Sequence, residues 1–362
     1  MKKEICIGLL LLVFILVGVK VVPGIAGSEG PEKITLTLEQ AVEMAIANNP
    51  QVGMASAAKK KKDITYQQAK NTGRNAEGST YNDRFNAYLK PKTAEREGEQ
   101  AAKVYDITIN GVKVQAENAY YNLIRAGEKQ EIAENTLKRA DEQLRIAKLR
   151  YDLGTAAKVE VLGAEAGQAA ARAGLTAARN DYKQKMLELN KCLAIDLETP
   201  VKLSGAFDFE KEEFLLQDLL DRALVEDMSI IQAQDTYEMA IWGYDFIKTY
   251  YGSNNWEARK AEQDMIAAGL SVEKTEDDVV TKVHKSYYSY LALEEQYQYL
   301  LKTVEVKQEA YRLTQLSYEN GLATLTEVQE ASDALKEAQV NLSDCVYQYN
   351  ILKSSMKYSL YQ

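Results

Sequence analysis

The sequence has few of the residues that interrupt helices and few of those that carry catalytic chemistry. Its 362 residues include 5 prolines, 3 cysteines, 2 tryptophans and a single histidine. Because proline is so scarce, long uninterrupted helices are possible. The sequence also has no glycine-rich phosphate loop, no nucleophile motif and no clustered Cys/His set of metal ligands. We therefore expect no catalytic residue, no cofactor and no metal site, and we predict that the protein is not an enzyme.

The charge of the chain excludes a second class of function. The formal net charge is −9, from 44 basic and 53 acidic residues, and no Lys/Arg stripe of the kind that binds phosphates stands out. We therefore expect no nucleic-acid partner. The cysteines add little, because Cys6 lies in the N-terminal segment and Cys192 and Cys345 are expected to be small free thiols in the core.

Long hydrophobic runs are missing except at the N-terminus. A basic Met-Lys-Lys start precedes an apolar run over residues 5–19, and small residues follow up to Ala26. This order is typical of a signal peptide, and the run is short for a membrane-spanning helix. We predict a signal peptide over residues 1–26, cleaved after Ala26, although an uncleaved anchor would share these features. Either way, residues 27–362 are expected to be exported.

What the sequence does contain is a long internal repeat. Residues 120–182 align without a gap to residues 287–349, at a shift of 167. Within this alignment Arg-Tyr-Asp-Leu-Gly at 150–154 falls on Ser-Tyr-Glu-Asn-Gly at 317–321. Two copies of one long unit indicate a duplicated architecture.

Each copy of the repeat predicts a helix, a tight turn and a second helix. The apolar residues of the first arm follow the alternating steps of four and three that define a coiled-coil seam. Arms of roughly 38 residues would be about 57 Å long at 1.5 Å per residue. The seam of the first arm comprises Ala133, Leu137, Ala140, Leu144, Ala147 and Tyr151. The return arm repeats the spacing at Leu162, Ala166, Ala169 and Ala173.

The turns of the two hairpins carry their own signals. Gly154 and Gly321 follow the last apolar position of each first arm, where a left-handed helix cap suits glycine. Thr324 and Glu327 are spaced as a capping box for the last helix. The many glycines and alanines of the first return arm would let the backbone of a neighbouring helix approach closely.

Shorter helices precede each hairpin. One is expected over residues 38–48, ending at Asn-Asn-Pro, and a second runs from residue 52 towards 71, with counterparts at a shift of 178. We therefore divide the mature chain into repeat one at about 34–195, a linker at about 196–211 and repeat two at about 212–362.

Two insert regions, about 71–114 and 250–278, are the least regular parts of the sequence. Asn110-Gly111 between alternating residues is a signal for a β-hairpin, and a helix through the same residues is the alternative. Residues 257–268 predict a helix. Aromatic residues gather in both inserts, where they indicate either helix packing or a belt at a membrane interface. They include Tyr81, Phe85, Tyr88, Trp242, Tyr244, Phe246, Tyr250, Tyr251 and Trp256.

The doubled arrangement resembles the TolC-type outer-membrane efflux proteins. The resemblance is carried by residues 38–41 with Asn49-Pro50, by 150–154 with 159–162, and by 318–321 with 326–328, and it covers nearly all of the mature chain. It implies a mostly all-α protomer of two tandem coiled-coil hairpins. The first insert could supply two poor strands of the kind that such proteins thread through the outer membrane and the second supplies none, so we expect a short-insert member with degenerate or missing β-barrel strands.

The same resemblance implies partners and a place in the cell. Three protomers would pool their hairpins into a hollow cylinder across the periplasm and associate with a membrane. An inner-membrane pump would supply substrates through a periplasmic adaptor protein. We expect an exported protein of the outer membrane or cell envelope. The alternative is a non-conducting coiled-coil scaffold of the envelope that binds partner proteins.

Site residues are also implied by the resemblance. Glu327 and Glu330 match positions of acidic rings at a closed pore, and Tyr318 and Glu160 match a tyrosine–carboxylate contact that keeps the hairpin tips shut. Ala323 stands where the family often has an arginine, so closure is expected to be held differently. An ordinary reading of the same glutamates is that they cap helices. The residues expected to contact an adaptor are Tyr151, Gly154, Thr155, Tyr318, Gly321 and Thr324.

Overall fold

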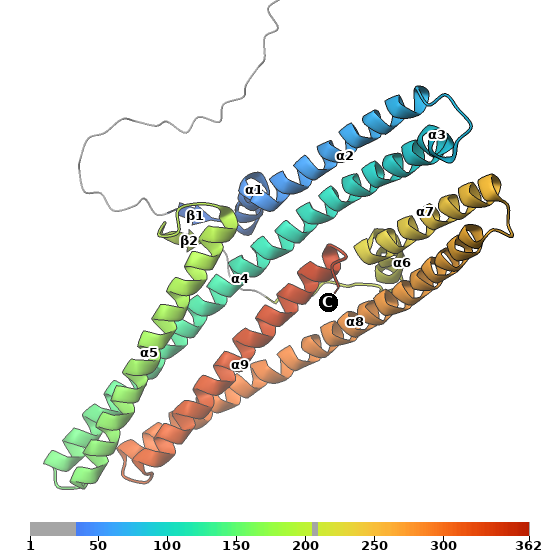
Figure 1. The fold of residues 1–362 in the computed structure, drawn as a ribbon. Coiled ribbons are helices and arrows are strands. Elements are labelled where there is room, and N and C mark those ends of the chain that lie inside the picture. Colours follow the sequence, from blue (N-terminus) through green and yellow to red (C-terminus); the bar gives the residue numbers. More distant parts are fainter. Residues whose placement is uncertain (1–33, 205–208, 362) are drawn as a thin grey trace, which may run out of the picture. The chain divides into compact units, whose positions relative to one another are not determined.

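The structure is a computed structural model that describes residues 34–204 and 209–361 (Figure 1). The predicted signal peptide, residues 1–26, lies outside the described residues. The elements of repeat one are β1 (Ile34–Leu36), α1 (Leu38–Asn48), α2 (Pro50–Arg74), α3 (Tyr81–Arg84), the π-helix η1 (Phe85–Leu89), α4 (Lys90–Asp152) and α5 (Lys158–Leu193). They are followed by β2 (Val201–Leu203), α6 (Leu216–Glu226), α7 (Met228–Tyr251), α8 (Trp256–Glu319) and α9 (Leu325–Lys357). The prediction of a mostly all-α chain is confirmed.

Local capping residues explain where the short helices begin. Thr37 and Gln40 form a reciprocal capping box at the start of α1. The Asn49 side chain accepts a hydrogen bond from the Gln51 amide, and Pro50 occupies the first turn of α2. Asp227 caps α7 in the same way in repeat two. The break between the two short helices is therefore encoded locally in both repeats.

The first arm of each hairpin is longer than the sequence suggested. α4 has 63 residues and α8 has 64, so each is about 95 Å long at 1.5 Å per residue. The β-hairpin considered at Asn110-Gly111 is wrong, because these residues lie inside α4. Val112, Ala116 and Tyr120 recur at steps of four and are all buried in one core, so the helical period prevailed over the local turn signal.

Each repeat has its own core where the short helices meet the hairpin. In repeat one, residues of α1, α4, α5 and the two strands pack around Leu123 and Leu193. The Tyr120 hydroxyl donates to the Ser204 carbonyl at 3.0 Å, beside the parallel β1–β2 pair. In repeat two, the buried hydroxyls of Tyr290 and Tyr349 lie 2.6 Å apart and contact the backbone before α6. In both repeats, therefore, a tyrosine hydroxyl of the core donates to a backbone carbonyl of the linker, at Ser204 and at Glu210.

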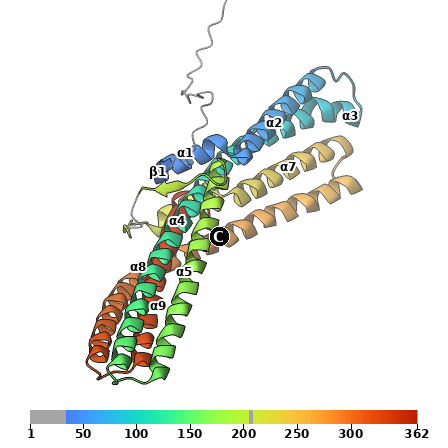
Figure 2. The same ribbon diagram turned by 90° about the vertical axis from the view of Figure 1, so that its left-hand side faces the viewer.

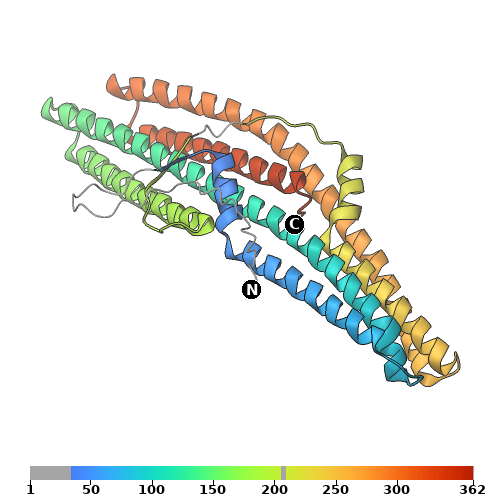
Figure 3. The same cartoon turned by 90° about the horizontal axis from the view of Figure 1, so that it is seen from above.

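The two hairpins lie side by side. Figures 2 and 3 show α9 beside α4, and α7 of repeat two contacts α4 and η1 of repeat one. Asp344 of α9 accepts ion pairs from Arg125 at 3.2 Å and from Lys129 at 2.8 Å. Closer to the start of α4, Arg96 pairs with the buried carboxylate of Asp235 on α7 at 2.7 Å. Charged contacts therefore join the repeats at two levels along α4.

The predicted seams differ in outcome. On α4, the seam residues Ala133, Ala140, Leu144 and Ala147 are buried, whereas Leu137 is only partly buried and Tyr151 is exposed. The prediction for α5 is wrong for a single copy of the chain, because all four of its predicted seam residues are exposed. The buried residues on this arm include Ala164 and Leu175 instead. The predicted seam residues of α5, which we call the outer stripe of α5, are Leu162, Ala166, Ala169 and Ala173. A row with coiled-coil spacing is thus left uncovered.

Two further findings concern the described residues. Cys192 and Cys345 are free, and burial raises the pKa of both thiols. No helix within residues 34–204 and 209–361 is both long and apolar enough to cross a membrane.

The two glycines Gly111 and Gly154 give opposite predictions for replacement by alanine. Gly111 lies within helix α4 with open space around it, so Gly111→Ala should stabilise the protein by about 0.5–1 kcal/mol. Gly154 has φ +72° at the turn, so Gly154→Ala should destabilise by about 1–2 kcal/mol. Urea unfolding of both variants measures the difference. A destabilised Gly111→Ala variant would contradict the continuous helix.

Candidate functional site

The candidate site lies at the hairpin tips, which comprise residues 150–160 and 317–327. Gly154 and Gly321 both adopt left-handed backbone conformations, with φ of +72° and +77°, as the sequence predicted. The Thr155 amide and hydroxyl donate to the Arg150 carbonyl at 2.8 and 3.0 Å and close the first turn. Gly154, Thr155, Gly321 and Thr324 are all exposed, which leaves the turns accessible to a partner.

An apolar cluster joins the two tips. Leu144, Ala147 and Ala164 of the first hairpin pack against Tyr318, Leu325 and Val328 of the second. Tyr318 has no exposed surface, although its side chain carries a polar hydroxyl. A buried tyrosine needs a hydrogen-bond partner for its hydroxyl.

The carboxylate of Glu160 is that partner. The Tyr318 hydroxyl donates to Glu160 Oε1 at 2.6 Å, so the contact implied by the resemblance is observed. Arg150 donates to the same oxygen at 3.2 Å, and its guanidinium lies over the Tyr318 ring at 4.7 Å. The three side chains form one unit that links α4 and α5 to α8. We call this unit the tip lock.

Burial and charge both hold the proton on Tyr318. Loss of water around the ring raises the pKa of the Tyr318 hydroxyl, and the hydrogen bond to Glu160 together with its negative charge raises it further. The positive charge of Arg150 opposes these effects only in part. At neutral pH Tyr318 in the tip lock is therefore a neutral phenol.

The other predicted pore residues are not part of the tip lock. The Glu327 carboxylate accepts from the Thr324 amide at 2.7 Å in a capping box that starts α9. This backbone hydrogen bond lowers the pKa of Glu327. Glu330 lies exposed one turn further along α9. The structure thus brings Glu160 and Tyr318 together and places Glu327 and Glu330 on the exposed surface of the neighbouring helix.

Arg150 was not identified from the sequence. Ala323, which stands where the family often has an arginine, packs against the apolar cluster instead. The cation comes from the other hairpin, at a position whose counterpart in the repeat is Ser317. This difference was only a weak signal, because Asp152 and Leu153 of the same turn also differ from their counterparts Glu319 and Asn320.

The tips also expose aliphatic side chains. Leu153 is 69% exposed, Val159 74% and Leu322 84%, and Tyr151 is 46% exposed. Exposed apolar side chains gathered in one place on a polar surface are typical of contact surfaces between proteins. The exposed tips and the tip lock therefore lie within the same few turns of helix.

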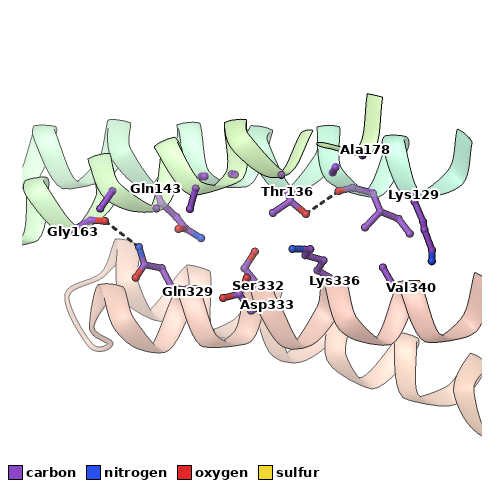
Figure 4. Close-up of a pocket in the computed structure, with 18 residues that line it drawn as sticks. Lys129, Thr136, Gln143, Gly163, Ala178, Gln329, Ser332, Asp333, Lys336 and Val340 are labelled. Atoms are coloured by element: carbon purple, nitrogen blue, oxygen red, sulfur yellow. Dashed lines mark hydrogen bonds between the residues drawn. The ribbon is translucent and has the colours of Figure 1, made fainter. Parts of the chain in front are cut away.

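Above the tips, a groove separates α5 from α9 (Figure 4). It has a volume of about 550 Å³ and is lined by residues of α4, by small residues of α5 and by mostly polar residues of α9. Gln329 reaches across to donate to the Gly163 carbonyl at 3.4 Å. A Cβ on Gly167 would lie 2.7 Å from the Gln329 amide nitrogen, so the Gln329 side chain occupies the space beside this glycine. Beyond that point α9 does not cover the small residues of α5.

We expect Tyr318→Phe to lower the free energy of unfolding by about 1.5–3 kcal/mol at pH 7, because a buried hydrogen bond to a charged group is lost. The pKa of Tyr318 is raised in the folded state above the ordinary value of about 10. Its contribution is therefore fully present below about pH 10 and is lost as pH rises through the folded-state pKa. Urea unfolding of wild type and variant at several pH values measures this difference.

The matched control is Tyr299→Phe, because Tyr299 is 69% exposed on the same helix. Its replacement should change the free energy of unfolding by less than about 0.5 kcal/mol. Equal effects of the two substitutions at pH 7 would show that the hydrogen bond to Glu160 contributes nothing.

Comparisons with known proteins agree with this architecture. No curated protein shows a significant sequence match to the chain. The solved structures with a similar fold include VceC of Vibrio cholerae, with a TM-score of 0.74 and 16% identity over 89% of this chain and 95% of that one. The CmeC outer membrane channel of Campylobacter jejuni gives 0.73 and 12% over 90% and 86%, and MtrE of Neisseria gonorrhoeae gives 0.68 and 15% over 89% and 88%.

A family model described as "Outer membrane efflux protein" matches residues 83–194 and 250–355, which include both long hairpins and both tips. The chain therefore belongs to the family of outer membrane efflux proteins, exported proteins of the outer membrane and cell envelope that are channels rather than enzymes.

Proposed function

We propose that three copies of the chain pool their hairpins into a water-filled channel that carries substrates out of the cell envelope. The channel receives these substrates from an inner-membrane pump through a periplasmic adaptor protein. The tip lock holds its pump-facing end shut. The family assignment and the fold shared with outer membrane channels support an efflux role. Trimer formation and the named partners are the part proposed here.

One observation carries the assembly: the outer stripe of α5 is exposed. Its residues have the alternating spacing of a coiled-coil seam and yet find no partner helix among the described residues. The neighbouring Ala170, Gly174 and Ala177 are exposed as well. Because small side chains let helix axes approach to the short end of the usual 8–10 Å range, this surface fits another long helix. A second copy of the same chain provides one.

The exposed tips are the proposed adaptor contacts. Leu153, Val159 and Leu322 present aliphatic surface next to the turns, where an adaptor would pack. Closing three tips together would bring the carboxylates of Glu327 and Glu330 from each copy around one axis. Like charges gathered in this way repel one another and favour cations. Contact with the adaptor then has to outweigh the tip lock for the channel to open.

The mass of the detergent-solubilised protein tests the assembly. We expect a particle of three chains by light scattering. Ala169→Arg combined with Ala173→Arg should reduce it to a single chain, because two charged side chains cannot be buried in a close helix contact. The exposed Ala47 of α1 provides the matched control, and Ala47→Arg should leave the mass unchanged. A wild-type protein that is a stable monomer would favour the non-conducting scaffold instead.

Conductance in planar bilayers tests the tip lock. Arg150→Ser removes the cation that Tyr318 and Glu160 share, so the channel should conduct more and close less often. Arg145 lies on the same helix and pairs only at the surface with Glu142, so Arg145→Ser serves as control. Equal conductance of Arg150→Ser, Arg145→Ser and wild type would exclude a gating role for Arg150. An assembled trimer that conducts nothing would overturn the channel itself.

A further inference from the structure

The end of the hairpins opposite the tips has a distinct surface. It is formed by residues 74–92, from the end of α2 to the start of α4, and by residues 245–260, from the end of α7 to the start of α8. The two segments lie together, as Figure 3 shows, and the Tyr81 ring contacts the rings of Phe246 and Tyr250 at 5.3 Å. We call this surface the basic aromatic end.

Aromatic residues are concentrated there. The two segments hold 7 aromatic residues, whereas aromatic residues make up only 9% of the whole chain. Tyr81, Phe85 and Phe246 pack on one another between the helices. Packing does not account for the rest, because Tyr88 is 72% exposed, Trp256 73% and Tyr251 47%. Exposed tyrosines also occur singly elsewhere on α8, at Tyr288 and Tyr299, whereas at this end three exposed aromatic side chains occur in two adjoining segments.

The charge of this end is opposite to that of the chain. It has seven basic residues, all exposed, against four acidic ones, in a chain whose formal net charge is −9. Two of the four acidic side chains are also occupied locally, Asp83 in the capping box of Thr80 and Glu257 with Lys260. The basic residues are Arg74, Arg84, Lys90, Lys92, Lys248, Arg259 and Lys260.

Cations and aromatic rings are interleaved on this surface. Arg259 lies over the Trp256 ring at 5.3 Å, and Lys92 lies over the nearby Trp242 ring at 4.1 Å. Tyrosine and tryptophan prefer the headgroup level of a bilayer, where the ring is half in apolar surroundings and its polar atom is in water. Lysine and arginine reach from such a position to lipid phosphates.

The tips present a different chemistry. α4 starts in the basic aromatic end and finishes at the tip, and its 63 residues span about 95 Å. There the exposed groups are mainly aliphatic, such as Leu153 and Leu322. The two ends of the hairpins are therefore suited to different partners.

We propose that the basic aromatic end binds the surface of a bilayer containing anionic phospholipids, with Tyr88, Tyr251 and Trp256 at headgroup level and the surrounding lysines and arginines on lipid phosphates. The chain is a protein of the outer membrane and cell envelope, so such a surface is within its reach. The proposal is independent of whether the assembled chain conducts. It assigns the membrane contact to one end of the hairpins.

Vesicle flotation with the purified full chain tests the charge requirement. The protein should float with vesicles of phosphatidylcholine that contain about 30% phosphatidylglycerol and much less with phosphatidylcholine alone. Because a lysine near an anionic surface contributes about 1 kcal/mol, reversing Lys90, Lys248 and Lys260 to glutamate should weaken binding by at least roughly 100-fold. All three are exposed, and circular dichroism checks that the variant folds.

The matched control reverses Lys282, Lys285 and Lys307, which are exposed further along α8. It introduces the same change in net charge outside the basic aromatic end, so it should retain binding. Equal loss in both triple variants would show a general charge effect and overturn the assigned surface. Binding to neutral vesicles as strong as to anionic ones would overturn the lipid chemistry, and a partner at this end would then have to be a protein.

A fluorescence measurement locates the contact. Trp242→Phe leaves Trp256 as the only tryptophan of the chain. Its emission should shift to shorter wavelength on anionic vesicles and be quenched by lipids brominated close to the headgroup. Floating protein whose Trp256 emission stays unchanged would place the membrane contact elsewhere and refute the proposal.

Discussion

A long helix that packs against one partner leaves its remaining surface to be covered by something else. This constraint governs the structure, because α4 and α8 extend for more than sixty residues and the shorter helices cover only part of their length. The surface of α4 is covered by α2, α5 and α9, which all pack against it. The surface of α5 is only partly covered, because α9 diverges across the groove and the outer stripe of α5 stays exposed. In the proposed assembly, further copies of the chain would cover this surface.

The tip lock is weak beside the packing that holds each hairpin together. A buried hydrogen bond to a charged group contributes about 1.5–3 kcal/mol, and a cation over an aromatic ring adds about 1 kcal/mol. Each hairpin is held by apolar burial between its own two helices, as around Leu123 and Leu189 in the first and Leu293 and Tyr349 in the second, at about 25 cal/mol per Å² of apolar surface. In the proposed channel, a partner that contacts the exposed aliphatic groups at the tips would therefore release the tip lock without unfolding a hairpin. The difference in magnitude permits gating in the proposed channel.

Several sequence predictions were wrong for identifiable physical reasons. Asn110-Gly111 has a local preference for a turn. The helix forms instead because it buries Val112 and Ala116 of the same stretch in the core. The outer stripe of α5 had the right spacing, but spacing alone does not say which chain covers it. Arg150 was overlooked because its contacts, Glu160 and Tyr318, are brought to it by a turn and by the second hairpin. Each of these outcomes depended on neighbours far apart in the sequence.

The sequence by itself determined the duplication, the helical class, the helix breaks and the conformations of the two turns. These features rest on periodicity and on local hydrogen bonds, such as the capping boxes of Thr37 and Thr324, which need only a few consecutive residues. Only the tertiary structure decided which faces are buried, how far α4 and α8 extend, and that Arg150 completes the contact of Tyr318 with Glu160. Those features require two hairpins, distant in the sequence, to lie against each other, because a face becomes buried only when another element covers it.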